Sequence, residues 1–435
     1  MKEQWVQTAS LGVQHVLAMY AGAVIVPLIT GNALKLTSEQ LTYLVSIDIF
    51  MCGIATFLQV WKGKWFGIGL PIVLGCTFTA VAPMIAIGQS YGLAGVYGAI
   101  LASGLFVVLI APVFSRLVRF FPPIVTGSVV TIIGLTLIPV AIKNMAGGEG
   151  SPDFGSAANI GLSFGTLLVI IVLYRFFTGF IRSISVLLGL LAGSMAAVVM
   201  GKVDFSPVSE ASWFHMIKPF VLGMPAFHWS AILTMILVAL VSLVESTGVY
   251  FAAADICGKN VNEEDLKKGY CSEGIASILG SLFNSFPYTA FSQNIGLIQL
   301  SGVKSRSVIF VTAFFLMLLG LIPKIGAFTT IIPPAVLGGA MVAMFGMVIA
   351  QGIKMLSKVD FSSQENLLIT ACSIGMGLGV TVVPDLFSQL PKSLQILTGN
   401  GIVAGSVTAI VLNMVFHRIG KREEKSNHMV QEKIS

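Results

Sequence analysis

The chain has 435 residues, of which 55% are hydrophobic and only 10% are charged, and its formal net charge is +6. Its mean hydropathy of +0.91 lies outside the range of soluble domains. This composition excludes a soluble protein and places most of the chain in lipid. Because a bilayer-spanning helix needs ~20 mainly apolar residues, the chain has room for about a dozen spans or slightly more.

Hydropathy, interrupted by polar, proline and glycine breaks, predicts fourteen spans. The first follows the N-terminus almost directly, but it is long and lacks a small-residue cleavage pattern, so we expect a retained span rather than a signal peptide. Two of the segments are short, and hydropathy alone also allows them to merge: 272–286 and 287–303. The other predicted spans are 5–30, 42–61, 67–89, 93–112, 122–143, 160–177, 183–201, 229–254, 305–322, 328–350, 365–384 and 399–418.

The basic residues test this count, because cytoplasmic loops hold an excess of Lys and Arg. With the N-terminus inside, most of the 25 Lys and Arg residues fall in cytoplasmic segments. Merging the two short segments would put the basic residues of the second half on the wrong side. We therefore expect a multi-pass protein of the cell (inner) membrane with both termini in the cytoplasm. The positive charge then reflects topology and an attraction to membrane lipid, and it does not indicate a nucleic-acid partner.

Residues that would bind a metal or a cofactor show no characteristic spacing. The five cysteines contain no Cys-x-x-Cys pair, so we interpret them as small buried hydrophobic residues rather than redox centres or metal ligands. There is no His-Glu-x-x-His motif and no glycine-rich phosphate loop with a Lys. No pair of nucleophile and base stands out either. We expect no cofactor, no metal and no enzymatic activity.

The sequence repeats itself in its two halves. The stretch Phe121-Pro-Pro-Ile-Val-Thr-Gly127 opens the fifth predicted span, and Ile332-Pro-Pro-Ala-Val-Leu-Gly338 recurs at the twelfth. The third and tenth spans are both rich in proline, glycine and β-branched or aromatic residues, which make poor continuous helices. Because the matching spans lie seven apart, an odd number, the two halves must have opposite orientations. An inverted repeat follows.

Paired broken segments place free backbone N–H groups and helix N-termini at mid-membrane, where inverted repeats bind their substrates. Proline and glycine also occur in membrane helices merely to allow close packing. That interpretation stays open for either segment alone. Two segments at matching positions favour a binding site.

An ionisable residue within a span costs at least ~2.5 kcal/mol, and four of those in the predicted spans are candidates for the chemistry: His15, Asp48, Glu245 and Glu273. Glu245 lies in the middle of the eighth span, and no basic residue lies at a similar depth in any predicted span, so we expect it to be functional. Glu273 opens the ninth span, where stabilisation by the helix dipole or exposure at the interface is the alternative. Asp48 lies less than two turns into the second predicted helix. The dipole of that helix and exposure at the membrane interface can by themselves explain an acidic residue at this position. His15 lies at mid-depth, and a structural and a functional role are equally open.

The third and tenth spans also carry polar and aromatic side chains near their breaks. An amide beside backbone N–H groups, an aromatic face and an opposed carboxylate would suit a flat, hydrogen-bonding heterocycle. These side chains are Thr77, Phe78, Ser292, Gln293 and Asn294.

At these residues the chain resembles the nucleobase/ascorbate transporter family, also called nucleobase cation symporter family 2. Residues 292–303 read Ser-Gln-Asn-Ile-Gly-Leu-Ile-Gln-Leu-Ser-Gly-Val and are similar to the family signature Gln-Asn-x-Gly-x-x-x-x-Thr. Ser301 replaces the usual Thr and keeps the hydroxyl. The resemblance covers essentially the whole chain, because other positions also resemble family landmarks: Gln14-His15, Thr77-Phe78, Glu245 and Glu273.

The resemblance implies an all-α membrane protein with 14 transmembrane segments in a 7+7 inverted repeat. We expect short extended strands in the broken third and tenth segments. A core domain would comprise 1–112 and 229–322, and a gate domain 113–228 and 323–420, followed by a cytoplasmic tail at 421–435. A homodimer is also expected from the family.

The resemblance also assigns roles to the site. Glu245 and Gln293 would hydrogen-bond the base, while Phe78 and the backbone at Ser292 complete the pocket. Gln at position 293 is typical of xanthine and urate carriers, whereas uracil permeases carry Glu there. The remaining residues expected at the substrate site are Thr77, Asn294 and His15.

Some purine carriers of the family have an Asp four residues after the eighth-span Glu, but here that position is Val249. This departure leaves Glu245 and Glu273 as the candidates for proton coupling. We therefore expect proton-coupled uptake of an oxidised purine, xanthine or uric acid, by alternating access, with the paired prolines as hinges. The alternatives are a permease of the same family for uracil or another nucleobase, and an uncoupled nucleobase facilitator, which would need a continuous polar path.

Overall fold

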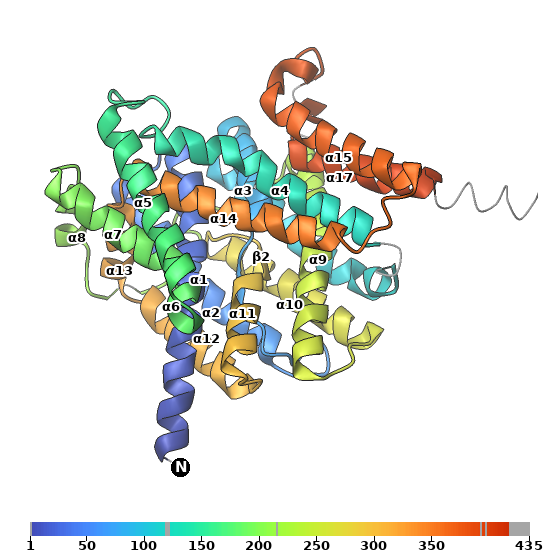
Figure 1. Cartoon of the computed structure of the whole chain (residues 1–435), viewed down its shortest axis with the longest axis horizontal. Helices are drawn as coiled ribbons and strands as arrows, with labels where there is room; N and C mark the ends of the chain where they lie inside the picture. The colour runs from blue at the N-terminus through green and yellow to red at the C-terminus, as the bar shows by residue number, and fades with distance from the viewer. Residues whose placement is uncertain (1, 118–121, 215, 392–393, 396–397, 417–435) are drawn as a thin grey trace, which may run out of the picture. The chain divides into compact units, whose positions relative to one another are not determined.

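The computed structural model describes residues 2–117, 122–214, 216–391, 394–395 and 398–416, and it is mostly helical (Figure 1). Phe121 and the predicted tail 421–435 lie outside the described residues. The elements in chain order are α1 (Lys2–Ala33), α2 (Ser38–Val60), β1 (Leu74–Cys76), η1 (Phe78–Ala80), α3 (Val81–Leu117), α4 (Pro123–Met145), α5 (Ala157–Phe176), α6 (Gly179–Ser183), α7 (Ser185–Val199), α8 (Ser206–Glu210), α9 (Trp229–Cys257), α10 (Glu263–Leu282), β2 (Tyr288–Ala290), α11 (Ser292–Ser301), α12 (Arg306–Gly320), α13 (Pro323–Thr330), α14 (Pro334–Leu356), α15 (Gln364–Val382), η3 (Pro384–Phe387) and α17 (Gly401–Met414).

The chain divides into two compact units. The first comprises Met1–Val118 and Leu137–Phe345, and the second comprises Arg119–Thr136 and Gly346–Ser435. All the predicted site residues belong to the first unit. The helices α4 and α14 each begin at the second proline of the repeated Pro-Pro motif, a position where the missing N–H of proline costs no helical hydrogen bond.

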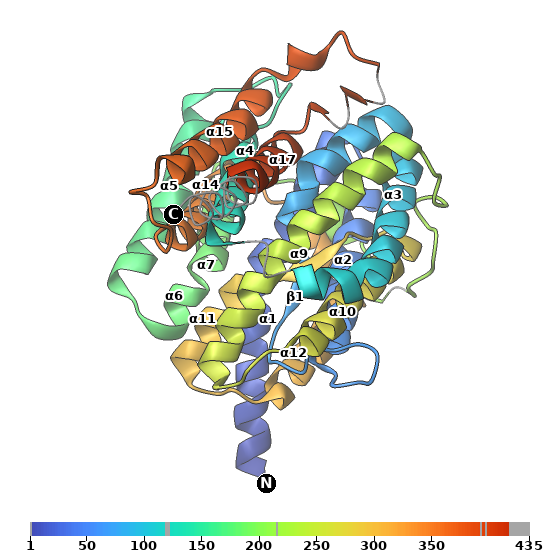
Figure 2. The same cartoon turned by 90° about the vertical axis from the view of Figure 1, so that its right-hand side faces the viewer.

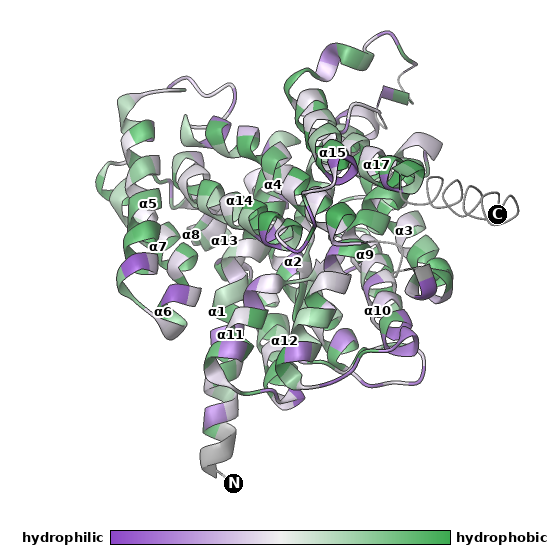
Figure 3. Ribbon diagram, turned by 45° about the vertical axis from the view of Figure 1, so that its right-hand side comes forward, coloured by the Kyte–Doolittle hydropathy of each residue, from purple (hydrophilic) through white to green (hydrophobic). Residues whose placement is uncertain are grey.

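Eight described helices are long and apolar enough to cross a membrane. The helices α12 and α13, bent by 79° at a short break, form a further candidate, and α7 and α17 are shorter apolar helices. The predicted total of fourteen also counts the two broken segments, and that total stays a prediction. Within the first unit, α5 and α7 carry hydrophobic residues on their exposed surfaces (Figure 3), as expected for helices in contact with lipid. Examples are Phe164, Leu168, Leu191, Met195 and Val199.

Two short strands interrupt the helices of the first unit, as the sequence predicts for the third and tenth segments. The strands β1 and β2 pair antiparallel, with Gly75 opposite Thr289. The pairing continues beyond the strands, because Thr77 N donates to Pro287 O at 3.0 Å. The helices α2, α9 and α10 contact the strands (Figure 2). The ladder therefore satisfies backbone groups that neither lipid nor a continuous helix could satisfy.

Glycines end or interrupt the long helices. Within α3, Gly92 has a φ of 71°, in the left-handed region that glycine favours. This break separates the predicted third span (67–89) from the fourth (93–112). At the end of α9, Gly258 has a φ of 64° and closes the helix, as glycine commonly does at this position.

The start of α10 differs from the sequence prediction. The predicted ninth span begins at residue 272, but the helix begins at Glu263. A capping box explains the earlier start: Asp265 N donates to Asn262 Oδ1 at 2.9 Å, and Asn262 N donates to Asp265 Oδ2 at 3.3 Å. The first turn is acidic, which suits the positive end of the helix dipole but lowers the hydropathy from which spans are predicted.

Candidate functional site

Both broken segments are bonded to the middle of α9. From η1, Thr79 donates its hydroxyl to Glu245 Oε2 at 3.1 Å. From β2, Ala290 N donates to Ser246 Oγ at 3.1 Å, and the hydroxyls of Ser246 and Thr289 are hydrogen-bonded at 2.8 Å. Two consecutive residues of α9 therefore hold the two segments. Glu245 lies at the point where the two halves of the repeat meet.

Glu245 is one of the half-buried residues of α9. The residue keeps part of its surface exposed, whereas the next residue, Ser246, is fully buried. None of the ion pairs among the described residues includes Glu245, and the bond from Thr79 is its one hydrogen bond there. A carboxylate accepts up to about four hydrogen bonds. Most of the acceptor capacity of Glu245 is therefore available to a bound molecule.

Three aromatic rings contact one another at the two broken segments. The rings of Phe78 and Phe291 are nearly parallel, at 15°, with centroids 6.3 Å apart. Phe345 approaches Phe78 edge-on, with centroids 5.7 Å apart. A Cβ on Gly75 would lie 2.5 Å from Phe291 Cζ, so only glycine lets this ring lie against β1. These flat faces suit contact with another planar ring.

The N-terminus of α11 has no side-chain cap. Its N-cap residue is Phe291, which makes no capping hydrogen bond, so the first backbone N–H groups of the helix are left without an intrahelical partner. Ser292 is exposed and Gln293 is partly exposed. In the part of the chain that the structure describes, the Gln293 amide has no hydrogen-bond partner. This helix end therefore offers backbone donors and a free amide in the positive field of the dipole.

The structure brings His15 and Asn294 together. Asn294 Nδ2 donates to His15 O at 3.0 Å and lies 3.1 Å from His15 Nδ1. Both residues are buried. The contact fixes the start of α11 against α1, so these two residues form a bridge behind the exposed Ser292 and Gln293.

Glu273 lies in the middle of α10 and not at its start. The side chain is only 2% exposed, and the helix begins ten residues earlier, at Glu263. The alternative of a helix-dipole or interfacial carboxylate is therefore wrong. Its carboxyl Oε1 accepts the hydroxyl hydrogen of Tyr250 from α9. Glu273 is thus a carboxyl group in the protein interior with a phenol as its partner.

The interpretation of Asp48 as an interfacial residue is also wrong. The helix α2 begins at Ser38, and Asp48 is fully buried. Its Oδ1 accepts hydrogen bonds from Ser285 Oγ at 3.0 Å and Tyr288 Oη at 3.2 Å. Cys52 Sγ donates to its Oδ2 at 3.8 Å. These contacts tie α2 to the segment that leads into β2.

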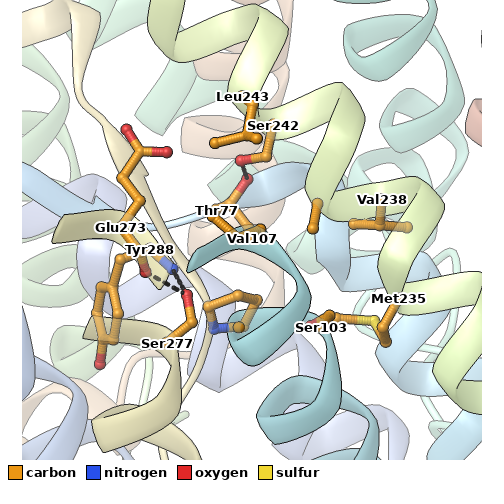
Figure 4. Close-up of a pocket in the computed structure, with 13 residues that line it drawn as sticks. Thr77, Ser103, Val107, Met235, Val238, Ser242, Leu243, Glu273, Ser277 and Tyr288 are labelled. Atoms are coloured by element: carbon orange, nitrogen blue, oxygen red, sulfur yellow. Dashed lines mark hydrogen bonds between the residues drawn. The ribbon is translucent and has the colours of Figure 1, made fainter. Parts of the chain in front are cut away.

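A pocket in the first unit lies on the side of Thr77 that faces α9 and α10 (Figure 4). Ser242 donates its hydroxyl to Thr77 Oγ1 at 3.5 Å, and Ser277 donates to Glu273 O at 2.8 Å. The pocket has room for a water molecule among these hydroxyls. Neither Glu245 nor Gln293 lines it. Its labelled lining residues are Thr77, Ser103, Val107, Met235, Val238, Ser242, Leu243, Glu273, Ser277 and Tyr288.

Sequence reasoning missed three residues of this region. Thr79 is the hydroxyl donor to Glu245, Phe291 faces Phe78, and Tyr250 donates to Glu273. Thr79 and Phe291 stand beside residues that were selected, so their position next to the two breaks was an available signal. Tyr250 gave no such signal in the sequence, because a tyrosine in an apolar helix is common and its partner, Glu273, lies in another helix.

The family model that matches this chain describes a permease family, and the match covers residues 6–386. A xanthine permease of Bacillus subtilis strain 168 is 64% identical over 98% of this chain and 97% of its own length. A uric acid permease, PucK, of the same organism is 61% identical over 96% of this chain and 97% of its own length.

Among solved structures, the transmembrane domain of a cyanobacterial bicarbonate transporter, BicA, is similar to this chain with a TM-score of 0.63. Its sequence identity is 15%, and the match covers 86% of this chain and 97% of that domain. At this identity the likeness concerns the fold alone. The fold is the 7+7 inverted repeat that the sequence predicts.

Proposed function

The chain belongs to the nucleobase/ascorbate transporter family, a family of multi-pass membrane transporters and not of enzymes, and we propose that it takes up an oxidised purine together with protons by alternating access. The observation that carries this proposal is the partly exposed Glu245 at the junction of the two broken segments. In an inverted repeat this junction is where substrates bind.

The base is held by groups with complementary hydrogen bonds. Glu245 accepts from ring N–H groups, while the Gln293 amide donates to a carbonyl and accepts from a neighbouring N–H. The ring of Phe78 contacts the face of the base. The backbone N–H groups at Ser292 donate to a further ring acceptor. Three more residues belong to the proposed substrate site, and some of them hold its other residues in place rather than contact the base. They are Thr77, His15 and Asn294.

The substrate is xanthine or uric acid. The similarity to a xanthine permease and a uric acid permease over nearly the whole chain supports this assignment. Both bases carry adjacent N–H and C=O groups that an amide reads with one donor and one acceptor. A uracil permease of the same family is the second candidate, and Gln293 argues against it.

Coupling uses a carboxyl group that is neutral in the loaded carrier. Glu245 and Glu273 lie in the first unit without a basic partner among the described ion pairs. Moving an unpaired charge through a low-dielectric interior is costly. Taking up a proton at Glu245 or Glu273 removes this cost and favours the transition of the loaded carrier.

The topology that accompanies this function is that of an inner-membrane protein with both termini in the cytoplasm. Segments 1–112 and 229–322 form the core that carries the base, and segments 113–228 and 323–420 form the gate. The Pro-Pro motifs at α4 and α14 supply the hinges. Two copies form a homodimer in the lipid bilayer.

Uptake competition in a strain that lacks its own base carriers tests the proposal. Labelled xanthine should accumulate inside the cell chemically unchanged, and unlabelled xanthine or urate should compete better than uracil, guanine or hypoxanthine. A protonophore should abolish accumulation. Accumulation that is indifferent to the protonophore would establish a facilitator, and stronger competition by uracil would establish the second candidate.

A further inference from the structure

Glu273 has an oriented partner whose role the proposed function does not include. Tyr250 on α9 is completely buried and donates its hydroxyl to Glu273 Oε1. Gln59, near the end of α2, donates from Nε2 to the oxygen of Tyr250 at 2.7 Å. Three helices thus contribute one residue each to a chain of hydrogen bonds that runs from Gln59 through Tyr250 to Glu273.

The amide of Gln59 determines which way the tyrosine donates. Because Nε2 donates to the phenolic oxygen, the hydroxyl hydrogen is free to point at the carboxylate. Gln59 is fully buried, and its Oε1 has no hydrogen-bond partner among the described residues. Its backbone is held as well, since Gly69 N donates to Gln59 O at 3.3 Å. The one hydrogen bond of this amide is therefore the one that orients Tyr250.

A donor oriented in this way favours the charged form of Glu273. A hydroxyl that donates to an ionised carboxylate forms a charge-assisted bond, which is stronger than its neutral counterpart. When Glu273 takes a proton, the carboxyl group becomes a poorer acceptor, and this bond weakens. The arrangement therefore promotes release of the proton from Glu273.

We propose that Tyr250 is a positioning residue for proton coupling, which holds the Glu273 carboxylate and sets the pH range over which it gives up its proton. The proposal rests on the coupling role of Glu273 in the proposed function. It adds a residue whose hydrogen bonds, among the described residues, go to Gln59 and Glu273 and to no residue proposed to bind the base.

The surroundings of Glu273 contain few other titratable groups. From α9 it faces Glu245 as well as Tyr250, and from its own helix it faces Tyr270. The uncharged hydroxyl of Ser246 on α9 also lies near Glu273, and behind the two tyrosines lie Gln59 of α2, bonded to Tyr250, and Phe114 of α3, whose ring centroid is 5.4 Å from that of Tyr270. From β2, Tyr288 donates its hydroxyl to Asp48 instead. The hydroxyl of Tyr250 is the donor for which the described residues show a hydrogen bond to this carboxyl group.

Tyr250→Phe tests the proposal, because it removes the hydroxyl and keeps the ring. Without its donor, Glu273 should hold its proton to higher pH. The alkaline decline of proton-driven xanthine uptake into proteoliposomes should move upward by about one pH unit, the size expected for one charge-assisted bond. Equilibrium exchange of xanthine and its competition constant should stay within ~3-fold of wild type, since no base contact is lost.

Tyr270→Phe is the matched control. Tyr270 is also a buried tyrosine next to Tyr250, with ring centroids 6.0 Å apart, but its hydroxyl is paired with Thr247 at 2.6 Å. It should leave the pH profile in place. Gln59→Leu frees the phenolic oxygen and should shift the profile in the same direction as Tyr250→Phe, but by less. This variant also keeps the proposal testable if Tyr250→Phe does not fold.

Two results separate this proposal from the one on which it rests. If Glu273→Gln uncouples uptake from the proton gradient but Tyr250→Phe and Gln59→Leu leave the pH profile unchanged, the role of Tyr250 is refuted and the coupling role of Glu273 stands. If Glu273→Gln still accumulates xanthine with the gradient, the coupling role itself fails. Folding of each variant is checked by its stabilisation against heat on addition of xanthine.

Discussion

Asp48 and Glu245 are both acidic residues in the helices of one unit. Side chains of the protein donate hydrogen bonds to both oxygens of the Asp48 carboxylate but to only one oxygen of Glu245. The carboxylate of Asp48 accepts from two hydroxyls and a thiol, and no part of the residue is exposed. Glu245 accepts from one hydroxyl and keeps exposed surface. The presence of a charge within a span therefore does not distinguish a structural residue from a functional one. The number of carboxylate acceptor positions that the protein leaves unpaired distinguishes the two kinds of residue.

Glu245→Gln should produce the largest effect, because it removes the acceptor that is open to the base. Concentrative uptake should fall by about 100-fold or more, since a hydrogen bond to a charged group contributes ~1.5–3 kcal/mol and a coupling site is lost as well. Initial rates of labelled xanthine uptake measure this. Glu263→Gln is the control, because Glu263 is an exposed carboxylate at the start of α10. Wild-type accumulation by Glu245→Gln would remove Glu245 from the mechanism.

Gln293→Glu sharpens the comparison by placing an acceptor where the chain has both a donor and an acceptor. It should weaken xanthine and urate binding by ~1–3 kcal/mol, the cost of an unpaired buried polar group, or roughly ten- to a hundredfold in affinity. Uracil should lose less or gain. Competition constants for purines and uracil decide the matter, with Gln299→Glu on the exposed part of α11 as the control. An unchanged purine-to-uracil preference would mean that Gln293 does not read the base.

Asp48→Asn tests the other side of the comparison. Since the Asp48 carboxylate joins α2 to the segment before β2, its replacement should lower the free energy of unfolding by ~1–3 kcal/mol. The competition constant for xanthine should change less than ~3-fold. Thermal unfolding in detergent, with and without xanthine, separates the two effects. Loss of binding in a protein that unfolds at the wild-type temperature would show that Asp48 is functional and that the comparison is wrong.

Lys202→Met should give the smallest effect, because it concerns a carboxylate in a loop outside the spans. Lys202 Nζ donates to Asp153 Oδ2 at 2.7 Å, and this hydrogen bond holds the pKa of Asp153 below its usual range. A lowered pKa in the folded state stabilises the protein above the ordinary Asp pKa of about 4, and this contribution is lost as the pH falls through the folded value.

The unfolding temperatures of wild type and Lys202→Met should therefore differ slightly at pH 7, begin to approach each other below about pH 4, and coincide once the pH has fallen through the folded pKa of Asp153. Uptake should not change. A difference that persists in acid would assign the role of Lys202 to its other contact, the hydrogen bond to Asn159 Oδ1 at 2.8 Å.

The sequence predicts the broken segments well, because local composition causes them. Proline and β-branched residues around Gly75 and Thr289 cannot continue a helix, and the structure has strands there. The repeat told us that the two segments belong together. The functional expectation for Glu245 followed from the lack of a basic residue near the middle of any predicted span, which the sequence shows directly.

The features that the sequence did not predict depend on specific side-chain contacts, most of them between distant parts of the chain. Hydropathy placed the start of α10 nine residues late, because a capping box and not apolar character begins the helix at Glu263. Asp48 was misread because Ser285 and Tyr288, which satisfy it, lie far away in the sequence. The same holds for Tyr250, whose partners are Gln59 and Glu273. No local pattern carries such information.

The pairing of β1 with β2 also has a consequence for biosynthesis. Thr56 of α2 already pairs with the backbone of Leu74, but the groups of β1 that pair with β2 find those partners only when Tyr288–Ala290 have been made. At ~5–20 residues per second, the ribosome needs on the order of ten seconds or more to reach the second strand. Until then the first strand has unpaired backbone groups at a depth where lipid offers none. The first half must therefore wait in a hydrated or chaperoned state, and a ribosome that stalls before β2 leaves a chain that the membrane cannot finish folding.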